Sequence, residues 1–213
     1  MAKHKLFSLR YWFFDLTKTT AAIPGLLWLR PKWIYESPKA KERIRGGALL
    51  CANHQSLLDP IYLQFAVTYR RQRFVCLQSF FEKPVTKWLF TRFLCIPIDK
   101  GNPSLKTIRE IGAALKEGWL VSVFPEGTIA GGASLQSFHS GVVLMASMGR
   151  CPLIPVYIRK KERFWQRMRI VIGEPITLAG EGKPGISEME EVARELQKRE
   201  ERLEELCLGK RKS

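Results

Sequence analysis

Short apolar runs alternate with helical patterns from residue 48 onward, and this alternation is the strongest constraint on the fold. Each run has four to six residues, many of them Val, Ile or Phe, and is bounded by Gly, Pro or charged residues. Runs of this kind are typical of strands. The predicted strands are 48–52, 74–77, 93–98, 120–124, 153–158 and 169–172, and the predicted helices are 60–70, 83–92, 104–117 and 138–147. The pattern predicts a single α/β domain with a mixed, largely parallel central sheet flanked by helices.

The segments around this core are also interpretable. The Pro- and charge-rich stretch 30–47 predicts a connector. The basic loop 159–167 joins two predicted strands and predicts a hairpin. At the carboxyl end, Ser187 followed by Glu190 has the spacing of a capping box, and Gly209 suits a helix end. We expect a docking helix there.

Positive charge is concentrated in the amino-terminal half of the chain. The net charge is +15 overall, and residues 1–100 carry 17 Lys and Arg against 6 Asp and Glu. This excess indicates an anionic partner such as lipid headgroups, nucleic acid or a phosphorylated substrate.

Aromatic and leucine residues crowd the same basic region, which favours a membrane surface. Residues 1–35 therefore form a predicted amphipathic segment that associates with the cytoplasmic face of a membrane, helped by anionic lipid, ahead of the α/β domain at 45–208. An ordinary amphipathic helix packed on the domain is the alternative. The longest early uncharged run, 19–29, has 11 residues, whereas a spanning helix needs about 20. Phe164 and Trp165 in the basic loop suggest a second membrane contact, with a solvated hairpin as the commoner alternative. No nucleic-acid motif is recognisable.

The five cysteines are scattered and odd in number. They predict reduced, buried thiols, with no disulfide framework and no zinc site.

One polar motif stands directly after the first predicted strand. Residues 53–59 read Asn-His-Gln-Ser-Leu-Leu-Asp and place Asp59 five positions after His54. A neutral imidazole steered by a carboxylate can take a proton from a hydroxyl near neutral pH. Five residues is the wrong spacing for one helical face. The pair can therefore meet only across a turn, for instance with Asp59 as helix N-cap and Pro60 at the first helical position. The alternative is a structural loop histidine and a carboxylate that only caps the helix.

A second motif, Phe-Pro-Glu-Gly-Thr at 124–128, follows another predicted strand. Ligands bind beyond the carboxyl ends of strands in open α/β sheets. If the two strands lie together, Glu126, Gly127 and Thr128 converge on the His54 crevice, where they could hold a phosphate or polar headgroup. A simple turn is the alternative reading.

Four blocks, in order, resemble the 1-acyl-sn-glycerol-3-phosphate (lysophosphatidate) acyltransferase family. The first block, 53–59, looks like the family's N-H-x-x-x-x-D motif. The second is Ile-Pro-Ile-Asp-Lys at 96–100, the third is Phe-Pro-Glu-Gly-Thr at 124–128, and the fourth is Leu-Ile-Pro-Val-Tyr-Ile at 153–158. The resemblance covers about residues 45–180.

The resemblance implies acyl transfer from a thioester, on acyl-CoA or acyl carrier protein, to a lysoglycerolipid hydroxyl. His54 would be the general base and Asp59 would stabilise its imidazolium form, as in a Ser-His-Asp triad. Neither a metal nor a cofactor is implied. The implied substrate-binding residues are Asn53, Lys100, Glu126, Gly127, Thr128 and His139.

Departures from the family pattern leave the acceptor open. Lys100 and Ile129 stand where the family usually has Arg, and Phe-His-Ser-Gly at 138–141 replaces Phe-Lys-x-Gly. Lys lacks the bidentate geometry of Arg, and Ile cannot bind phosphate. Lysophosphatidate is the expected acceptor. The alternatives are another lysophospholipid, a lysoglycolipid or an amino-acid lipid, and a non-enzymatic basic membrane-binding protein.

Overall fold

The computed structural model describes residues 11–56, 58–99, 104–125, 135–160, 162–163, 165–178 and 185–209, with only the backbone of residues 135–140. Its elements follow in chain order. They are α1 (Trp12–Leu29), β1 (Lys32–Tyr35), η3 (Lys39–Lys41), β2 (Ala48–Ala52), α2 (Asp59–Gln64), β3 (Gln72–Leu77), η4 (Gln78–Phe81), α3 (Pro84–Arg92), β4 (Ile96–Ile98), α4 (Leu105–Lys116), β5 (Leu120–Val123), α5 (Leu135–Gly149), β6 (Leu153–Arg159), β7 (Arg169–Ile172) and α6 (Ile186–Leu208).

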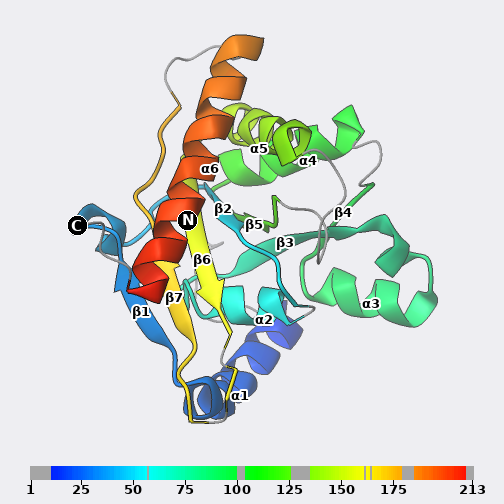
Figure 1. The fold of residues 1–213 in the computed structure, drawn as a ribbon. Coiled ribbons are helices and arrows are strands. Elements are labelled where there is room, and N and C mark those ends of the chain that lie inside the picture. The colour runs from blue at the N-terminus through cyan, green and yellow to red at the C-terminus, as the bar shows by residue number, and fades with distance from the viewer. Residues whose placement is uncertain are drawn as a thin grey trace.

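The centre is a seven-stranded sheet in the order β1-β7-β6-β2-β5-β3-β4 (Figure 1). Every neighbouring pair is parallel except β6 and β7, which are antiparallel. The predicted α/β class, with a mixed and largely parallel sheet, is therefore confirmed. The antiparallel pair also confirms the hairpin predicted around the basic loop.

Helices cover both faces of the sheet. Alternate residues of β2 point to opposite sides, so that Leu49 and Cys51 join a core with α4, α5 and α6, whereas Leu50 packs in a second core with α2. In Figure 1, α4, α5 and α6 lie together on one side, and α1 and α2 lie on the other. Strand β2 is fully buried, because it lies inside both cores. The polar loop that follows it therefore starts from a rigid position.

Helix α1 is fixed to the domain by a buried ion pair. The Arg71 guanidinium donates to both carboxylate oxygens of Asp15, at 2.6 and 2.7 Å, and both side chains are buried. Further along the helix, Gly25 lets the backbone approach Phe65, since an added Cβ would lie 2.6 Å from that ring. One side of α1 therefore packs on the domain, as in the alternative reading of this segment, while several large apolar side chains on its other side are exposed. Among the described helices, none combines the length and apolar character needed to cross a membrane.

Three local expectations were wrong. The stretch 30–47 is not only a connector, because Lys32–Tyr35 forms an edge strand that is mostly exposed and so lacks an apolar pattern. Helix α6 begins at Ile186 with Gly185 in the N-cap position and no side-chain cap. Ser187 therefore lies inside the helix and forms no capping box. The third concerns Asp59, which is not the N-cap of α2. The stop of α6 at Gly209 was correct: its φ of 75° is in the left-handed region that glycine favours.

Candidate active site

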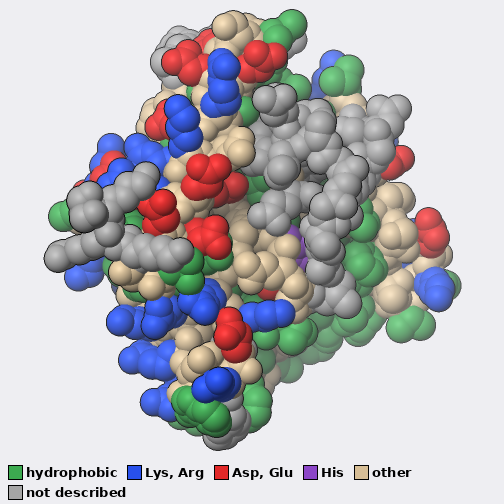
Figure 2. Space-filling model, viewed as in Figure 1, with side chains coloured by type: hydrophobic (Ala, Val, Ile, Leu, Met, Phe, Trp, Pro, Cys, Tyr) green, Lys and Arg blue, Asp and Glu red, His purple; other side chains and the backbone are tan. Residues whose placement is uncertain are grey.

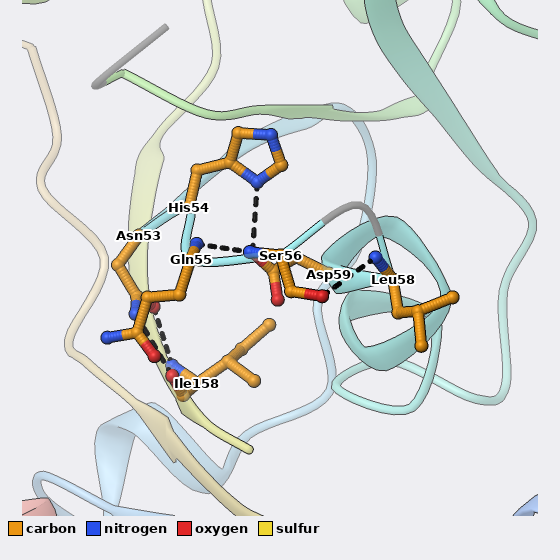
Figure 3. Close-up of polar contacts among 7 residues, drawn as sticks. All are labelled: Asn53, His54, Gln55, Ser56, Leu58, Asp59 and Ile158. Carbon is orange, nitrogen blue, oxygen red and sulfur yellow. Dashed lines mark hydrogen bonds and ion pairs between the residues drawn. The ribbon is translucent and has the colours of Figure 1, made fainter. Parts of the chain in front are cut away.

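The first motif forms a loop that is fastened to the neighbouring strand. The side-chain amide of Asn53 makes two hydrogen bonds with the backbone of Ile158: its oxygen accepts from the N–H at 2.7 Å, and its nitrogen donates to the carbonyl at 3.0 Å (Figure 3). Asn53 is 5% exposed. The amide thus holds the end of β2 against the end of β6. Both of its described hydrogen bonds are made to the protein backbone.

Asp59 closes the loop on itself. One carboxylate oxygen, Oδ2, accepts from the backbone N–H groups of Gln55 (2.5 Å) and Ser56 (2.6 Å) and lies 2.9 Å from Nδ1 of His54 (Figure 3). The predicted meeting of His54 and Asp59 across a turn is present. The predicted N-cap role of Asp59 is wrong: helix α2 begins at Asp59, Leu58 occupies the N-cap position, and no side chain caps the helix. The carboxylate is directed back toward the loop, where three donors converge on it.

This contact determines which ring nitrogen carries the proton when the imidazole is neutral. A carboxylate only accepts hydrogen bonds, so the contact places a proton on Nδ1 and leaves the lone pair of a neutral ring on Nε2. The Asp59 side chain is 4% exposed and that of His54 is 17% exposed. The carboxylate is therefore shielded from water, while the imidazole reaches the surface. A ring held in this way is suited to general-base chemistry.

The structure also brings Phe124, the first residue of the third block, against His54. Strands β2 and β5 are hydrogen-bonded neighbours, and the ring of Phe124, just beyond β5, stacks on His54 with centroids 4.5 Å apart. The expected convergence depended on these two strands lying side by side, and they do. Phe124 packs one face of the imidazole and limits its rotation.

Two tyrosines near the loop were not singled out from the sequence. Burial, with a smaller contribution from the Asp59 carboxylate, raises the pKa of Tyr62. Burial also raises the pKa of Tyr157, whose hydroxyl donates to Glu204 at 3.0 Å and also contacts the side chain of Gln55. Both phenols stay neutral at physiological pH, and the Tyr157 hydroxyl supports the loop through its contact with Gln55. Their position in apolar segments gave no sign of this in the sequence.

The remaining predicted substrate residues stay predictions. Lys100, Glu126, Gly127 and Thr128 lie outside the described residues, and His139 lies in α5 where only the backbone is described. Within the part of the chain that the structure describes, no group of three or more His, Cys, Asp or Glu side chains could hold a metal ion.

The histidine–carboxylate loop lies beyond the carboxyl end of a central strand, which is where enzymes with an open α/β sheet bind their ligands. The family model described as Acyltransferase matches residues 35–159. The chain belongs to this acyltransferase family, and the matched region contains the whole 53–59 loop.

Named relatives agree with this assignment. The chain is 27% identical over 139 residues to a 1-acyl-sn-glycerol-3-phosphate acyltransferase of Bacillus subtilis (strain 168), a match that covers 62% of this chain and 67% of the relative. It is 26% identical over 163 residues to the enzyme of the same name from Streptococcus pneumoniae, covering 74% of this chain and 60% of that relative. The crystal structure of the acyltransferase PlsC from Thermotoga maritima has the same fold, with a TM-score of 0.63 and 22% identity over 96% of this chain and 83% of that one.

Proposed function

We propose that the protein transfers a fatty acyl group from a thioester, on acyl-CoA or acyl carrier protein, to the hydroxyl of a lysoglycerolipid. The expected acceptor is lysophosphatidate, so that the product is phosphatidate for phospholipid synthesis. The 2.9 Å contact between His54 and Asp59, within a region that matches the acyltransferase family, carries the proposal. The names of the bacterial relatives support this acceptor.

In this mechanism the acceptor hydroxyl gives its proton to Nε2 of His54 as its oxygen attacks the thioester carbonyl. Asp59 stabilises the imidazolium that forms. Collapse of the tetrahedral intermediate breaks the carbon–sulfur bond, and the imidazolium returns the proton to the departing thiolate. The reaction needs no acyl-enzyme, because the substrate hydroxyl takes the place of a catalytic serine. Asn53 acts as a positioning residue through its hydrogen bonds to Ile158.

The residues that the family resemblance assigns to substrate binding keep that role in this proposal. Lys100, Glu126, Gly127, Thr128 and His139 shape the headgroup site. The catalytic domain extends over residues 45–208, and the segment 1–35 associates peripherally with the cytoplasmic face of a membrane. Neither a metal nor a cofactor is part of this chemistry.

A different lysolipid acceptor is the second candidate, because Ile129 removes a positive charge where the family usually has Arg. Membership of the acyltransferase family favours either enzyme over a non-enzymatic membrane-binding protein.

The test is acyl transfer from a radiolabelled thioester to a panel of lysolipids that includes lysophosphatidate. We expect activity in the wild type and a loss of about 10²–10⁴ in rate for His54→Ala, since this is the usual contribution of a general base. Circular dichroism establishes that the variant is folded. Wild-type turnover in folded His54→Ala would refute the mechanism. Robust transfer to uncharged or zwitterionic lysolipids, with none to lysophosphatidate, would change the acceptor and leave the chemistry standing.

A further inference from the structure

The connection between β6 and β7 is strongly basic. From Arg159 to Arg169 it contains six Lys and Arg and a single acidic residue, Glu162. The side chains of Lys160, Arg163 and Arg167 are exposed. Glu162 accepts from Arg159 at 3.2 Å, at the base of the connection. Among the described residues of the hairpin, exposed cations therefore outnumber the one exposed acidic side chain, Glu162.

An exposed tryptophan stands within this positive charge. Trp165 is 67% exposed, and the guanidinium of Arg163 lies over its ring at 5.6 Å from the centroid. An indole beside cationic side chains combines an apolar body with polar surroundings. This combination is typical of side chains that settle at the headgroup level of a bilayer.

The hairpin is joined to the end of α1. The backbone N–H of Met168 donates to the carbonyl of Leu29 at 3.0 Å, and the N–H of Lys32 donates back to the carbonyl of Met168 at 2.7 Å. In addition, the Arg167 side chain donates to the carbonyls of Arg30 and Pro31. The hairpin base and the end of α1 are therefore held together by backbone and side-chain bonds on both sides.

Together these elements make one surface of mixed apolar and basic character, which we call the hairpin–helix surface. Its apolar members on α1, Ile23, Leu27 and Trp28, are 66%, 73% and 57% exposed. The complete set is Ile23, Leu27, Trp28, Arg30, Lys32, Lys160, Arg163, Trp165 and Arg167. In Figure 2, Lys and Arg side chains gather at the lower left, where Figure 1 shows β1, β7 and the end of α1.

This surface adjoins the candidate active site. Ile158, the residue that Asn53 holds with two hydrogen bonds, immediately precedes the hairpin. The His54 loop and the hairpin therefore leave the same end of the sheet, the end where β2 and β6 finish. A partner bound to the hairpin–helix surface therefore lies at the end of the sheet from which the His54 loop leaves.

We propose that the hairpin–helix surface docks on an anionic lipid bilayer and so presents the His54 loop to acceptor lipids lying in that bilayer. The inference rests on the proposed function and adds the β6–β7 hairpin to the amino-terminal segment as a membrane contact. Charge complementarity selects anionic headgroups, and each basic residue near such a surface adds measurably to binding. The exposed aliphatic side chains of Ile23 and Leu27 favour a bilayer over a nucleic acid, which has no apolar layer to receive them.

Cosedimentation of the full-length protein with phosphatidylcholine vesicles, with and without phosphatidylglycerol, tests the binding. We expect Lys160→Ala/Arg163→Ala to weaken partitioning to anionic vesicles by about twenty- to thirty-fold, since each lost cation is worth about five-fold. Trp165→Ala should weaken it further, and Trp165→Phe should restore most of the loss. Lys198→Ala, which removes an exposed cation from α6, is the matched control and should bind like the wild type. Binding of the wild type should fall as salt is raised.

A paired activity measurement links the surface to the site. The hairpin variants should lose transfer to acceptor embedded in anionic vesicles but keep the wild-type rate with short-chain acceptor dispersed below its micellar concentration. His54→Ala should bind vesicles like the wild type but transfer no acyl group in either assay. Failure of the proposed function thus appears as wild-type inactivity, whatever the vesicles show. The docking proposal is overturned if the hairpin variants bind anionic vesicles like the wild type, or if the surface binds duplex oligonucleotide or a second copy of the chain in place of vesicles.

Discussion

Substitution of Asp59 by Asn separates a catalytic carboxylate from a structural one. The wild-type Oδ2 accepts two backbone N–H groups and faces Nδ1 of His54. The amide oxygen of the variant, in the same place, can accept the same bonds, but as a neutral group. Hydrogen bonds to charged groups are worth about 1.5–3 kcal/mol and neutral ones about 0.5–1.5 kcal/mol. We therefore expect a stability loss of about 1 kcal/mol for each of the three contacts, or about 3 kcal/mol in all.

The catalytic loss should be similar in free energy to this structural effect or larger. A neutral amide can orient the imidazole but cannot offset the positive charge that forms on it. We expect kcat to fall by about 10²–10⁴ with KM nearly unchanged. This fall corresponds to about 2.7–5.4 kcal/mol of lost transition-state stabilisation.

The assay is steady-state acyl transfer with a saturating thioester, alongside thermal unfolding of the same samples. Ser56→Ala is the matched control, because among the described residues its hydroxyl accepts a 3.2 Å bond from the N–H of Leu58 and makes no contact with His54 or Asp59. Its removal perturbs the loop without touching the His54–Asp59 contact. Near-normal kcat in folded Asp59→Asn would show that the carboxylate only supports the loop, and would refute the catalytic reading.

Three further predictions concern the docking of α1, the pH dependence of stability and the acceptor. Asp15→Ala should destabilise the protein by about 3–5 kcal/mol, because it removes the carboxylate that pairs with the buried Arg71 guanidinium, whereas Asp15→Leu/Arg71→Met should unfold at a higher temperature than the single variant. Burial lowers the pKa of Lys18 from 10.5 to about 8, so the unfolded chain binds more protons than the folded one between these values. The unfolding free energy of the wild type should therefore gain a contribution as pH rises from 8 to 10.5, and denaturant titrations of Lys18→Met should lack that gain. If the acceptor is lysophosphatidate, Lys100→Ala should raise its KM by an amount equivalent to about 1.5–3 kcal/mol, and an unchanged KM would point to an acceptor without a free phosphate. In that second case, Ile129→Arg should improve the use of lysophosphatidate.

The buried strands were predictable because burial on both faces leaves a direct mark on the sequence. The runs at Ala48–Ala52 and Arg169–Ile172 were predicted with their observed bounds. A strand in this position is apolar wherever it is buried, as in all of β2 and in the three residues of β7 after Arg169, and this distinguishes it from its polar surroundings. Strand β1 left no such mark, since three of its four residues are exposed at the edge of the sheet.

For the site, the sequence by itself determined which residue types were present and that His54 and Asp59 required a turn in order to meet. Only the tertiary structure decided the direction of the Asp59 carboxylate, because the helix start and the two loop N–H groups compete for the same acceptor. It also decided the contacts between distant segments, such as Asn53 with Ile158, 105 residues apart, and Asp15 with Arg71, 56 apart. Such pairs have no local periodicity. The first pair forms because sheet order places the ends of β2 and β6 together, and the second because α1 packs beside the start of β3. In both, a buried polar group must find its partner on whichever neighbour the fold supplies.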